Sequence, residues 1–182
     1  MINGQYIPDL ILQNVPGKMM VMRNFGGNER RNQDGTIRNS YGQRNFVVKF
    51  DEEQGRALEA QGWDIFWFQK RKEEDPLEAG LEVPVNLSTK KLNGEDRRPD
   101  EVILVTETQR VLQNEKTIGN LDGATIISAD IKLIPRQKQK RKTGEIKIAP
   151  ILSRMYVKIA SDTFDKPYDN LPWADADGNI TI

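Results

Sequence analysis

A pair of long β-strands near the end of the chain places the strongest constraint on its fold. Residues 124–135 and 145–159 both read as strands, and residues 136–144 between them form a short basic segment. Since a short connection joins antiparallel neighbours, the sequence predicts a long β-hairpin with a cationic tip.

Most of the remaining chain is also predicted to form strands, separated by loops rich in glycine, asparagine and charged residues. These strands span residues 11–15, 18–22, 45–50, 62–72, 81–87 and 101–105. Pro16 and Gly17 favour a turn between the first two, and Pro84 indicates an edge position or a bulge in the fifth. Residues 25–41 and 90–99 are polar loops, and the former is either mobile or the tip of a large hairpin.

Two short helices complete the predicted elements. Asp51 suits the N-cap of the first, Glu52 and Glu53 complement the dipole of its first turn, and Gly62 suits its C′ position. The second helix covers residues 114–121. The predicted fold class is mainly β, or β-rich α+β, in the form of an OB-fold-like Greek-key barrel with long loops. A β-sandwich has the same number of strands and stays open as an alternative.

The segment GWDIFWFQKRK, residues 62–72, places four aromatic rings directly before three cations. In a strand its side chains alternate between two faces. One face, which has the character of a core, consists of Trp63, Ile65 and Trp67, and the other of Phe66, Phe68 and Lys70. Rings beside cations are the groups with which proteins stack unpaired bases and hold their phosphates. A strand buried on both faces, followed by solvated cations, explains the same pattern without any ligand.

The residue types that the chain lacks exclude several classes of function. None of its 182 residues is cysteine or histidine, which excludes disulfides, thiolate nucleophiles, the Ser-His-Asp triad and nearly all zinc chemistry. A site made of carboxylates alone for a hard metal ion stays open. We therefore predict no catalytic residue, no cofactor and no metal site, and expect a protein that is not an enzyme.

The start of the chain gives no indication of export. It has no basic region followed by an apolar one, and no apolar run along the chain approaches the length of a membrane span. The absence of cysteine agrees with a reducing compartment. The sequence predicts a cytoplasmic protein without membrane contact.

Charge is distributed unevenly along the chain, although its 27 basic and 27 acidic residues cancel. Residues 18–49 and 132–147 are net positive, and the second stretch is the more basic. Residues 161–182 instead carry five aspartates against one lysine. We therefore divide the chain into an OB-like nucleic-acid-binding domain, residues 1–160, and an acidic C-terminal tail, residues 161–182.

Five short motifs are spread along the chain. They are Asn24-Phe25-Gly26-Gly27, Arg44-Asn45-Phe46 at the start of a strand, Gly62-Trp63 after a short acidic helix, Leu121-Asp122 before a strand, and the long strand that ends near Ile159. Together they resemble a family of small early-region proteins of tailed bacteriophages over about residues 8–160. The resemblance implies an OB-like fold, single-stranded DNA binding, and a role in phage replication or recombination. The aromatic residues after Gly62-Trp63, where family members often have polar ones, and the extended tail depart from this pattern.

The leading interpretation is a non-enzymatic protein that coats single-stranded DNA by aromatic stacking and by phosphate contacts from lysine and arginine, with little sequence specificity. Its candidate binding residues are Arg23, Phe25, Arg38, Tyr41, Arg44, Phe46, Phe66, Phe68, Lys70, Lys72, Lys138, Lys140, Arg141 and Lys142. Of these, Phe25 and Phe46 suit the core as well as they suit a stacking role.

Two other functions stay open at this point. A phage interaction protein or inhibitor would act on a host enzyme or defence factor through a protein surface, and a metal-dependent nuclease would use scattered carboxylates. The acidic tail is a candidate contact for a replication or recombination protein, or a competitor for the basic groove. The sequence is compatible with a homo-oligomer but does not determine the oligomeric state.

Overall fold

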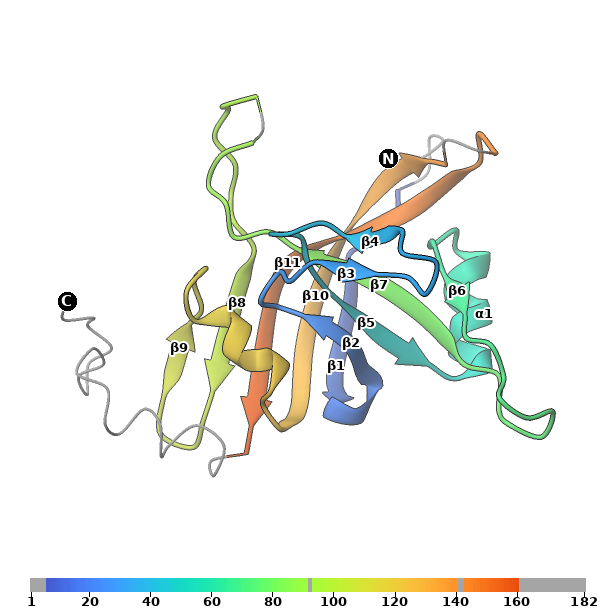
Figure 1. The fold of residues 1–182 in the computed structure, drawn as a ribbon, viewed down its shortest axis with the longest axis horizontal. Coiled ribbons are helices and arrows are strands. Elements are labelled where there is room, and N and C mark those ends of the chain that lie inside the picture. Colours follow the sequence, from blue (N-terminus) through green and yellow to red (C-terminus); the bar gives the residue numbers. More distant parts are fainter. Residues whose placement is uncertain (1–5, 92, 141–142, 161–182) are drawn as a thin grey trace.

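Strands that alternate between apolar and polar residues form two sheets in the computed structural model, which describes residues 6–91, 93–140 and 143–160. The five-stranded sheet has the order β1 (Leu10–Pro16), β10 (Ile126–Gln139), β11 (Ile146–Ile159), β8 (Glu101–Val105) and β9 (Arg110–Leu112). The four-stranded sheet has the order β2 (Met20–Asn24), β5 (Arg44–Phe50), β7 (Ala79–Val85) and β6 (Phe66–Trp67). The short strands β3 (Arg30–Arg31) and β4 (Ile37–Asn39) form a separate hairpin (Figure 1).

The predicted long hairpin is confirmed. β10 and β11 pair in antiparallel register from Ile126 opposite Ile159 to Gln139 opposite Ile146. Both strands are long enough to project beyond the body of the molecule, so the basic segment lies at the tip of an extended ribbon (Figure 1). On its other side, β11 pairs with β8 in parallel. All other strand pairs of the two sheets are antiparallel within the described residues.

A sharp corner carries the chain from one sheet to the other. β1 and β2 are joined by the 3₁₀ helix η1 (Gly17–Met19), and Gly17 lies directly against the backbone of Ile126. A Cβ on Gly17 would stand 1.7 Å from the carbonyl oxygen of Ile126, so this corner requires glycine. The predicted turn is confirmed, and the two strands that it joins belong to different sheets.

The helix α1 (Glu52–Ala60) begins and ends where the sequence predicts. The Asp51 carboxylate accepts a hydrogen bond from the Gln54 N–H at 2.8 Å, and Gly62 has a φ of +92°. No helix within the described ranges is long and apolar enough to cross a membrane.

The second predicted helix is wrong. The Asn114 carboxamide oxygen accepts hydrogen bonds from the N–H groups of Lys116 and Thr117, which closes a tight turn in place of an α-helical one. Only η2 (Ile118–Asp122) is helical, as a 3₁₀ segment. The sequence analysis also missed the edge strand β9, whose three residues are all exposed.

A single hydrophobic core lies between the two sheets. Its largest fully buried side chains are those of Trp63, Phe25, Phe46, Leu81, Ile118, Leu121, Ile131, Leu133, Leu152 and Met155. The mainly β, OB-like fold is thus confirmed, although neither sheet closes on itself within the described residues.

Pro84 of β7 is exposed, and β6 pairs with β7 only at Ala79 and Gly80, so Pro84 occupies the edge position that its missing N–H favours.

Hydrogen bonds join the sheets at several places, two of which involve motifs noted in the sequence. At one place the Ile148 N–H donates to the Gly62 carbonyl and the Asp64 N–H donates to the Ile148 carbonyl, both at 2.8 Å. At the other, the Asp122 carboxylate accepts hydrogen bonds from the N–H groups of Phe25 at 2.7 Å and Gly26 at 2.9 Å. The turn after β2 is therefore fixed to η2, which leads into β10.

Replacing Asp122 with alanine is expected to lower the free energy of unfolding by about 1 to 3 kcal/mol, because the part-buried N–H of Phe25 loses its acceptor. Asp122→Asn should cost less, since its carbonyl oxygen still accepts one hydrogen bond. Urea denaturation measures both. The matched control is Asp130→Ala, in which an exposed carboxylate loses one backbone donor, the Asn14 N–H. Wild-type stability in the Asp122→Ala variant would contradict a structural role for this carboxylate.

The buried carboxyl group of Asp100 is expected to make stability fall as pH rises. Burial raises the pKa of Asp100 from 3.8 to about 6, although its carboxylate accepts a hydrogen bond from the Asn86 N–H and faces Arg97. Between these two values the folded state binds the extra proton, so this contribution to stability is present below about pH 4 and lost by about pH 6.

Asp100→Asn carries no charge at any pH and keeps an acceptor for Asn86. Relative to this variant, the wild-type protein should lose about 2 to 3 kcal/mol of unfolding free energy between about pH 4 and about pH 7. Urea denaturation of both proteins across this range measures the difference. Parallel pH profiles would show that Asp100 titrates normally.

Candidate nucleic-acid interface

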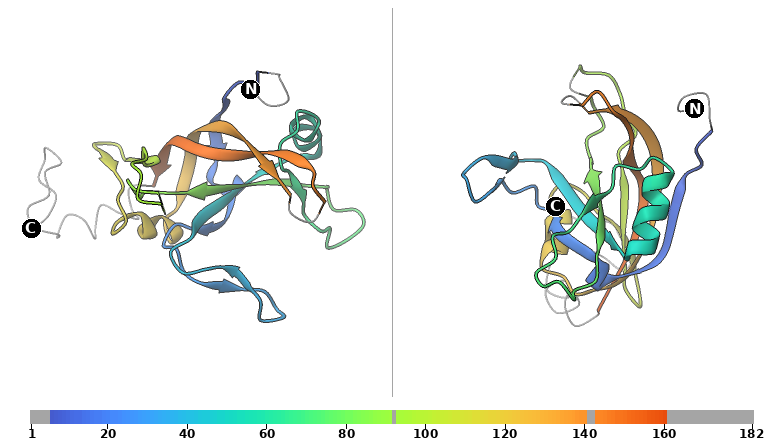
Figure 2. Two further views of the ribbon diagram at one scale, coloured as in Figure 1. Left: turned by 90° about the horizontal axis from the view of Figure 1, so that it is seen from above. Right: turned by 90° about the vertical axis from the view of Figure 1, so that its right-hand side faces the viewer.

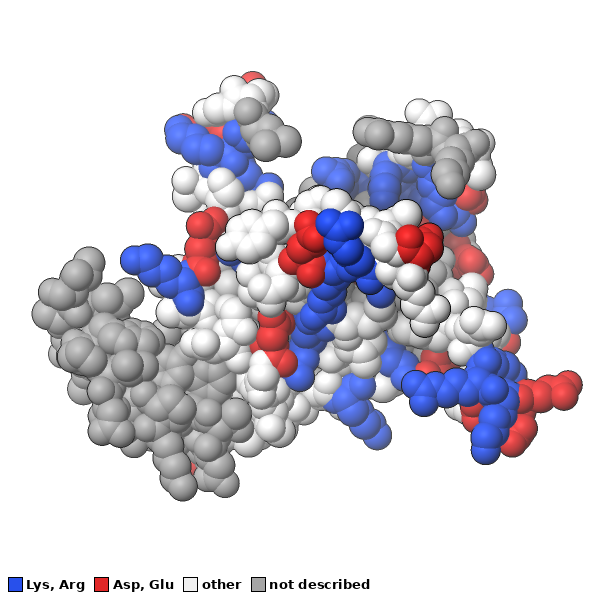
Figure 3. All heavy atoms as spheres, in the orientation of Figure 1, with Lys and Arg blue, Asp and Glu red and all other residues white. Residues whose placement is uncertain are grey.

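The four-stranded sheet turns one face to the core and most of the other to solvent, although Val47 at an outward position of β5 is buried. Along β5 and β7 the inward residues, such as Phe46 and Leu81, are buried, whereas Asn45, Lys49 and Glu82 alternate with them on the outer face. Figure 3 views the molecule from the side on which β2 to β5 lie in front of the five-stranded sheet. We call this solvent-facing side the outer face.

A pair of rings lies at the β6 edge of the outer face. Phe66 and Phe68 are half-buried and meet edge to face, with ring centroids 5.1 Å apart. The Phe66 ring covers Gly80 of β7, and the ammonium group of Lys49 lies 5.6 Å from the centroid of the Phe68 ring. The same ammonium group pairs with Glu78 at 2.5 Å. Each ring is thus partly packed on the sheet and partly available to solvent.

The predicted strand does not reach Lys70. β6 ends at Trp67, so the two-residue alternation does not continue to Lys70. Lys70 and Lys72 are exposed on the loop between β6 and β7, where the Lys70 ammonium donates to the Glu73 carbonyl and the Lys72 N–H donates to Asp75. Lys49, which the sequence analysis did not select, takes the place beside the rings because its strand pairs with β7.

The β3–β4 hairpin lies at the opposite, β2 edge of the outer face and projects away from the body (Figure 2). Arg30 anchors it, donating to the carbonyl of Met22 at 3.2 Å and to that of Arg23. Arg38 is exposed, and its guanidinium lies 3.5 Å from the sulfur of Met22. Basic side chains gather in a column over this region of the outer face (Figure 3).

The loop between β4 and β5 adds an exposed ring. Tyr41 is 84% exposed, and the Gly42 N–H beside it donates to the Gly27 carbonyl at 2.7 Å, which fixes the loop. Arg44 follows at the start of β5 and is half-buried, and its Nε atom has no hydrogen-bond partner among the described residues. Arg38, Tyr41 and Arg44, all predicted to bind nucleic acid, therefore belong to two consecutive strands and the loop that joins them.

Phe25 and Phe46 belong to the core, which corrects their assignment as stacking residues. Both have an exposed fraction of 0%, and their rings stack on each other with centroids 5.4 Å apart. Neither ring has a free face for a base. The Phe25 N–H donates to the Asp122 carboxylate, which fixes the backbone at the position where the Phe25 ring is buried. Phe46 is buried because it occupies an inward position of β5.

Arg23 acts within the protein as well. Its guanidinium group donates to the carbonyls of Leu121 at 3.0 Å and Ala124 at 2.9 Å. These contacts hold β2 to η2 and its following turn, so one nitrogen of the half-buried Arg23 guanidinium has a structural role. The predicted phosphate contact of Arg23 stays a prediction.

The basic hairpin starts beside the aromatic segment. Lys140 and Lys138 lie 2.8 Å and 3.8 Å from the carboxylate of Asp64, and hydrogen bonding to Asp64 raises the pKa of Lys140. Both lysines therefore lie at the carboxylate of Asp64, a residue two positions before Phe66 in the chain. The predicted residues Arg141 and Lys142 lie outside the described residues, as does the acidic tail.

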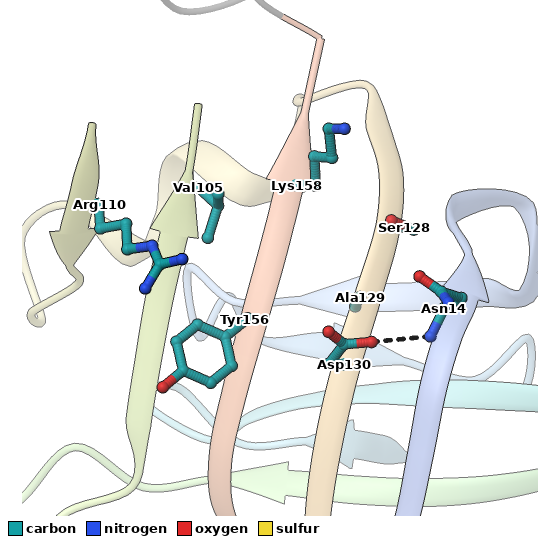
Figure 4. A pocket seen from close by; sticks show the side chains of 8 residues that line it. All are labelled: Asn14, Val105, Arg110, Ser128, Ala129, Asp130, Tyr156 and Lys158. Atoms are coloured by element: carbon teal, nitrogen blue, oxygen red, sulfur yellow. Dashed lines mark hydrogen bonds between the residues drawn. The ribbon is translucent and has the colours of Figure 1, made fainter. Parts of the chain in front are cut away.

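A further concave surface lies on the outside of the five-stranded sheet, with a volume of about 320 Å³. Arg110 of β9 and Tyr156 and Lys158 of β11 line it, and Asp130 of β10 accepts a hydrogen bond from the Asn14 N–H at 2.8 Å (Figure 4). This hollow contains none of the predicted binding residues. It has two cations against one carboxylate, so it is less suited to a polyanion than the outer face.

Comparison with known proteins gives one match. The family model described as “Putative phage ssDNA-binding domain” matches residues 2–181. No curated protein and no solved structure matches the chain.

Gly80→Ala is expected to displace the Phe66 ring from the sheet. A Cβ at Gly80 would stand 2.5 Å from Cζ of Phe66 and within 2.9 Å of two further ring atoms, so the ring must move at a cost of about 1 to 3 kcal/mol. Urea denaturation and the NMR shifts of the Phe66 ring measure both effects. Gly123→Ala, whose Cβ would meet nothing within 4 Å, is the matched control. Unchanged ring shifts in Gly80→Ala would contradict the contact.

Proposed function

The chain belongs to the phage single-stranded-DNA-binding domain family, and on this premise we propose that it binds the DNA strand across the outer face of its four-stranded sheet. The observation that carries this proposal is the half-exposed pair of Phe66 and Phe68 with the Lys49 ammonium group over one ring. A base that stacks on this pair places its phosphates near a cation on the same surface.

The DNA strand runs from these rings toward the β2 edge, where Tyr41 offers a second stacking surface. The phosphates of the DNA pair with Arg38 and Arg44 at that edge, and with Lys138 and Lys140 at the basic hairpin. Both lysines exchange their ion pair with the partly exposed Asp64 for a phosphate, and the cost is small because the pair lies at the surface, where solvent screens it. The net charge of zero is compatible with this binding because the cations are clustered.

Recognition of this kind depends little on base identity. Aromatic faces stack on any base, and phosphate contacts are the same for every sequence. On the outer face the amide group of Asn45, a residue type that could read a base edge, already donates to Glu82 at 2.7 Å. A protein that coats single-stranded DNA during replication or recombination must bind DNA of any base sequence, and this surface meets that need.

The same proposal assigns no catalytic step to the chain. We place its role in phage DNA replication or recombination, with the acidic tail of residues 161–182 as the segment that contacts another protein of that process. Self-association along a coated strand is compatible with this role.

The double variant Phe66→Leu/Phe68→Leu tests the stacking surface. Leucine keeps apolar bulk over Gly80, so stability should change by less than about 1.5 kcal/mol for each site. Loss of both flat faces should weaken binding to oligothymidylate by about 1 to 3 kcal/mol per base contact, which is at least about fivefold. Fluorescence anisotropy of a labelled oligonucleotide at fixed salt measures this, and higher salt should weaken binding further.

Tyr6→Leu is the matched control, because it removes a ring that is 75% exposed but precedes β1 of the other sheet. Wild-type affinity in a folded double variant would overturn the role of Phe66 and Phe68. If the wild-type protein binds no oligonucleotide at low salt, the chain is better explained as an interaction protein that acts on a host factor.

A further inference from the structure

We infer that the bound strand continues past the outer face into a second, cationic groove, where the protein holds its sugar-phosphate backbone. This inference rests on the proposed function and extends the site that it uses. The cationic groove lies between the loop residues 88–91 and 93–98, which follow β7, and the β10–β11 hairpin. Both of these elements project from the same end of the molecule (Figures 1 and 2).

The lining of the cationic groove suits a polyanion. The groove has a volume of about 950 Å³, and five of its nine lining residues are Lys90, Lys91, Arg97, Arg98 and Arg136. The other four have amide, hydroxyl or aliphatic side chains, so no carboxylate lines it. No aromatic residue lines it either, so the groove suits phosphates and does not stack bases.

Apart from Arg97, which pairs with the buried Asp100, the cations of the groove are available for exchange with phosphate. Lys91 pairs with Glu95 at 2.7 Å and Arg98 with Glu101 at 2.6 Å, and each of these cations is more than half exposed. Exposed pairs of this kind are weak and are readily replaced by a phosphate partner. The exposed side chain of Arg136 forms no ion pair or hydrogen bond with any other described residue.

A connecting groove links this surface to the proposed binding site. It has a volume of about 450 Å³ and is lined by Arg44 at one end and by Asn86 and Ser88 at the other. The same two residues, Asn86 and Ser88, also line the cationic groove. The surface is therefore continuous from Arg44, next to the exposed ring of Tyr41, to the five cations.

Continuity of the two grooves has a measurable consequence. A short oligonucleotide fills the outer face alone, whereas a longer one reaches the cationic groove and gains phosphate contacts. A longer oligonucleotide also offers more positions at which the outer face can bind, which raises affinity slightly. Affinity should rise with oligonucleotide length by more than this statistical effect, and high salt should reduce the additional affinity. The triple variant Lys90→Ala/Lys91→Ala/Arg136→Ala removes three of the exposed cations while leaving Arg97, the partner of buried Asp100, in place.

The experiment measures the affinity of the full chain for oligothymidylates of about 4 to about 16 nucleotides, the range that one OB-like domain covers. The matched control, Arg110→Ala/Lys132→Ala/Lys158→Ala, removes two lysines and one arginine from the five-stranded sheet. The groove variant should bind the longest oligonucleotide at least about tenfold more weakly than the control. The slope of its log affinity against log salt concentration should be smaller in magnitude by about 2. Its affinity for the shortest should stay within about twofold of the control, and urea denaturation confirms that both variants fold.

Equal affinities of the two variants at every length would overturn the inference, and so would an equal loss at every length in the groove variant. In both cases the proposed function survives, because the wild-type protein still binds. Absence of wild-type binding at all lengths would instead overturn the proposed function and the groove with it.

Discussion

The geometry of the binding surface depends on how the Asp122 carboxylate holds two backbone N–H groups across the boundary between the sheets. A carboxylate that accepts two N–H bonds satisfies donors that the turn after β2 cannot pair internally. This contact fixes the turn, draws Phe25 into the core and sets the point from which the β3–β4 hairpin departs. Arg23 strengthens the same connection through the carbonyls of Leu121 and Ala124.

The motifs that resemble the phage family are therefore mainly structural. Asn24-Phe25-Gly26-Gly27 and Leu121-Asp122 are far apart in the sequence, yet they form the two halves of one hydrogen-bonded corner. Gly62-Trp63 likewise meets Ile148 of the long hairpin. Short motifs of this kind identify the fold because they keep the two sheets in place, and the binding that we propose uses other side chains on the outer face.

The proposed site combines groups from separate parts of the chain on a protein whose charges cancel overall. β6 contributes rings, β5 contributes Lys49, and the β3–β4 region contributes Arg38 and Tyr41. The long hairpin and the loop of residues 88–98 extend the positive surface beyond the sheet. A strand bound in this way meets cations at several points, so affinity depends on the arrangement of the cations and not on the total charge.

The sequence by itself determined the mainly β class, the long basic hairpin and the limits of α1, because alternation, capping and turn chemistry are local properties. It also separated the buried Trp63 and Ile65 from Phe66 on the opposite face. Only the tertiary structure decided which candidate residues share a surface. Burial of Phe25 and Phe46 depends on packing between the sheets, and the position of Lys49 beside Phe68 depends on strand pairing. Both are long-range contacts, which no local pattern specifies.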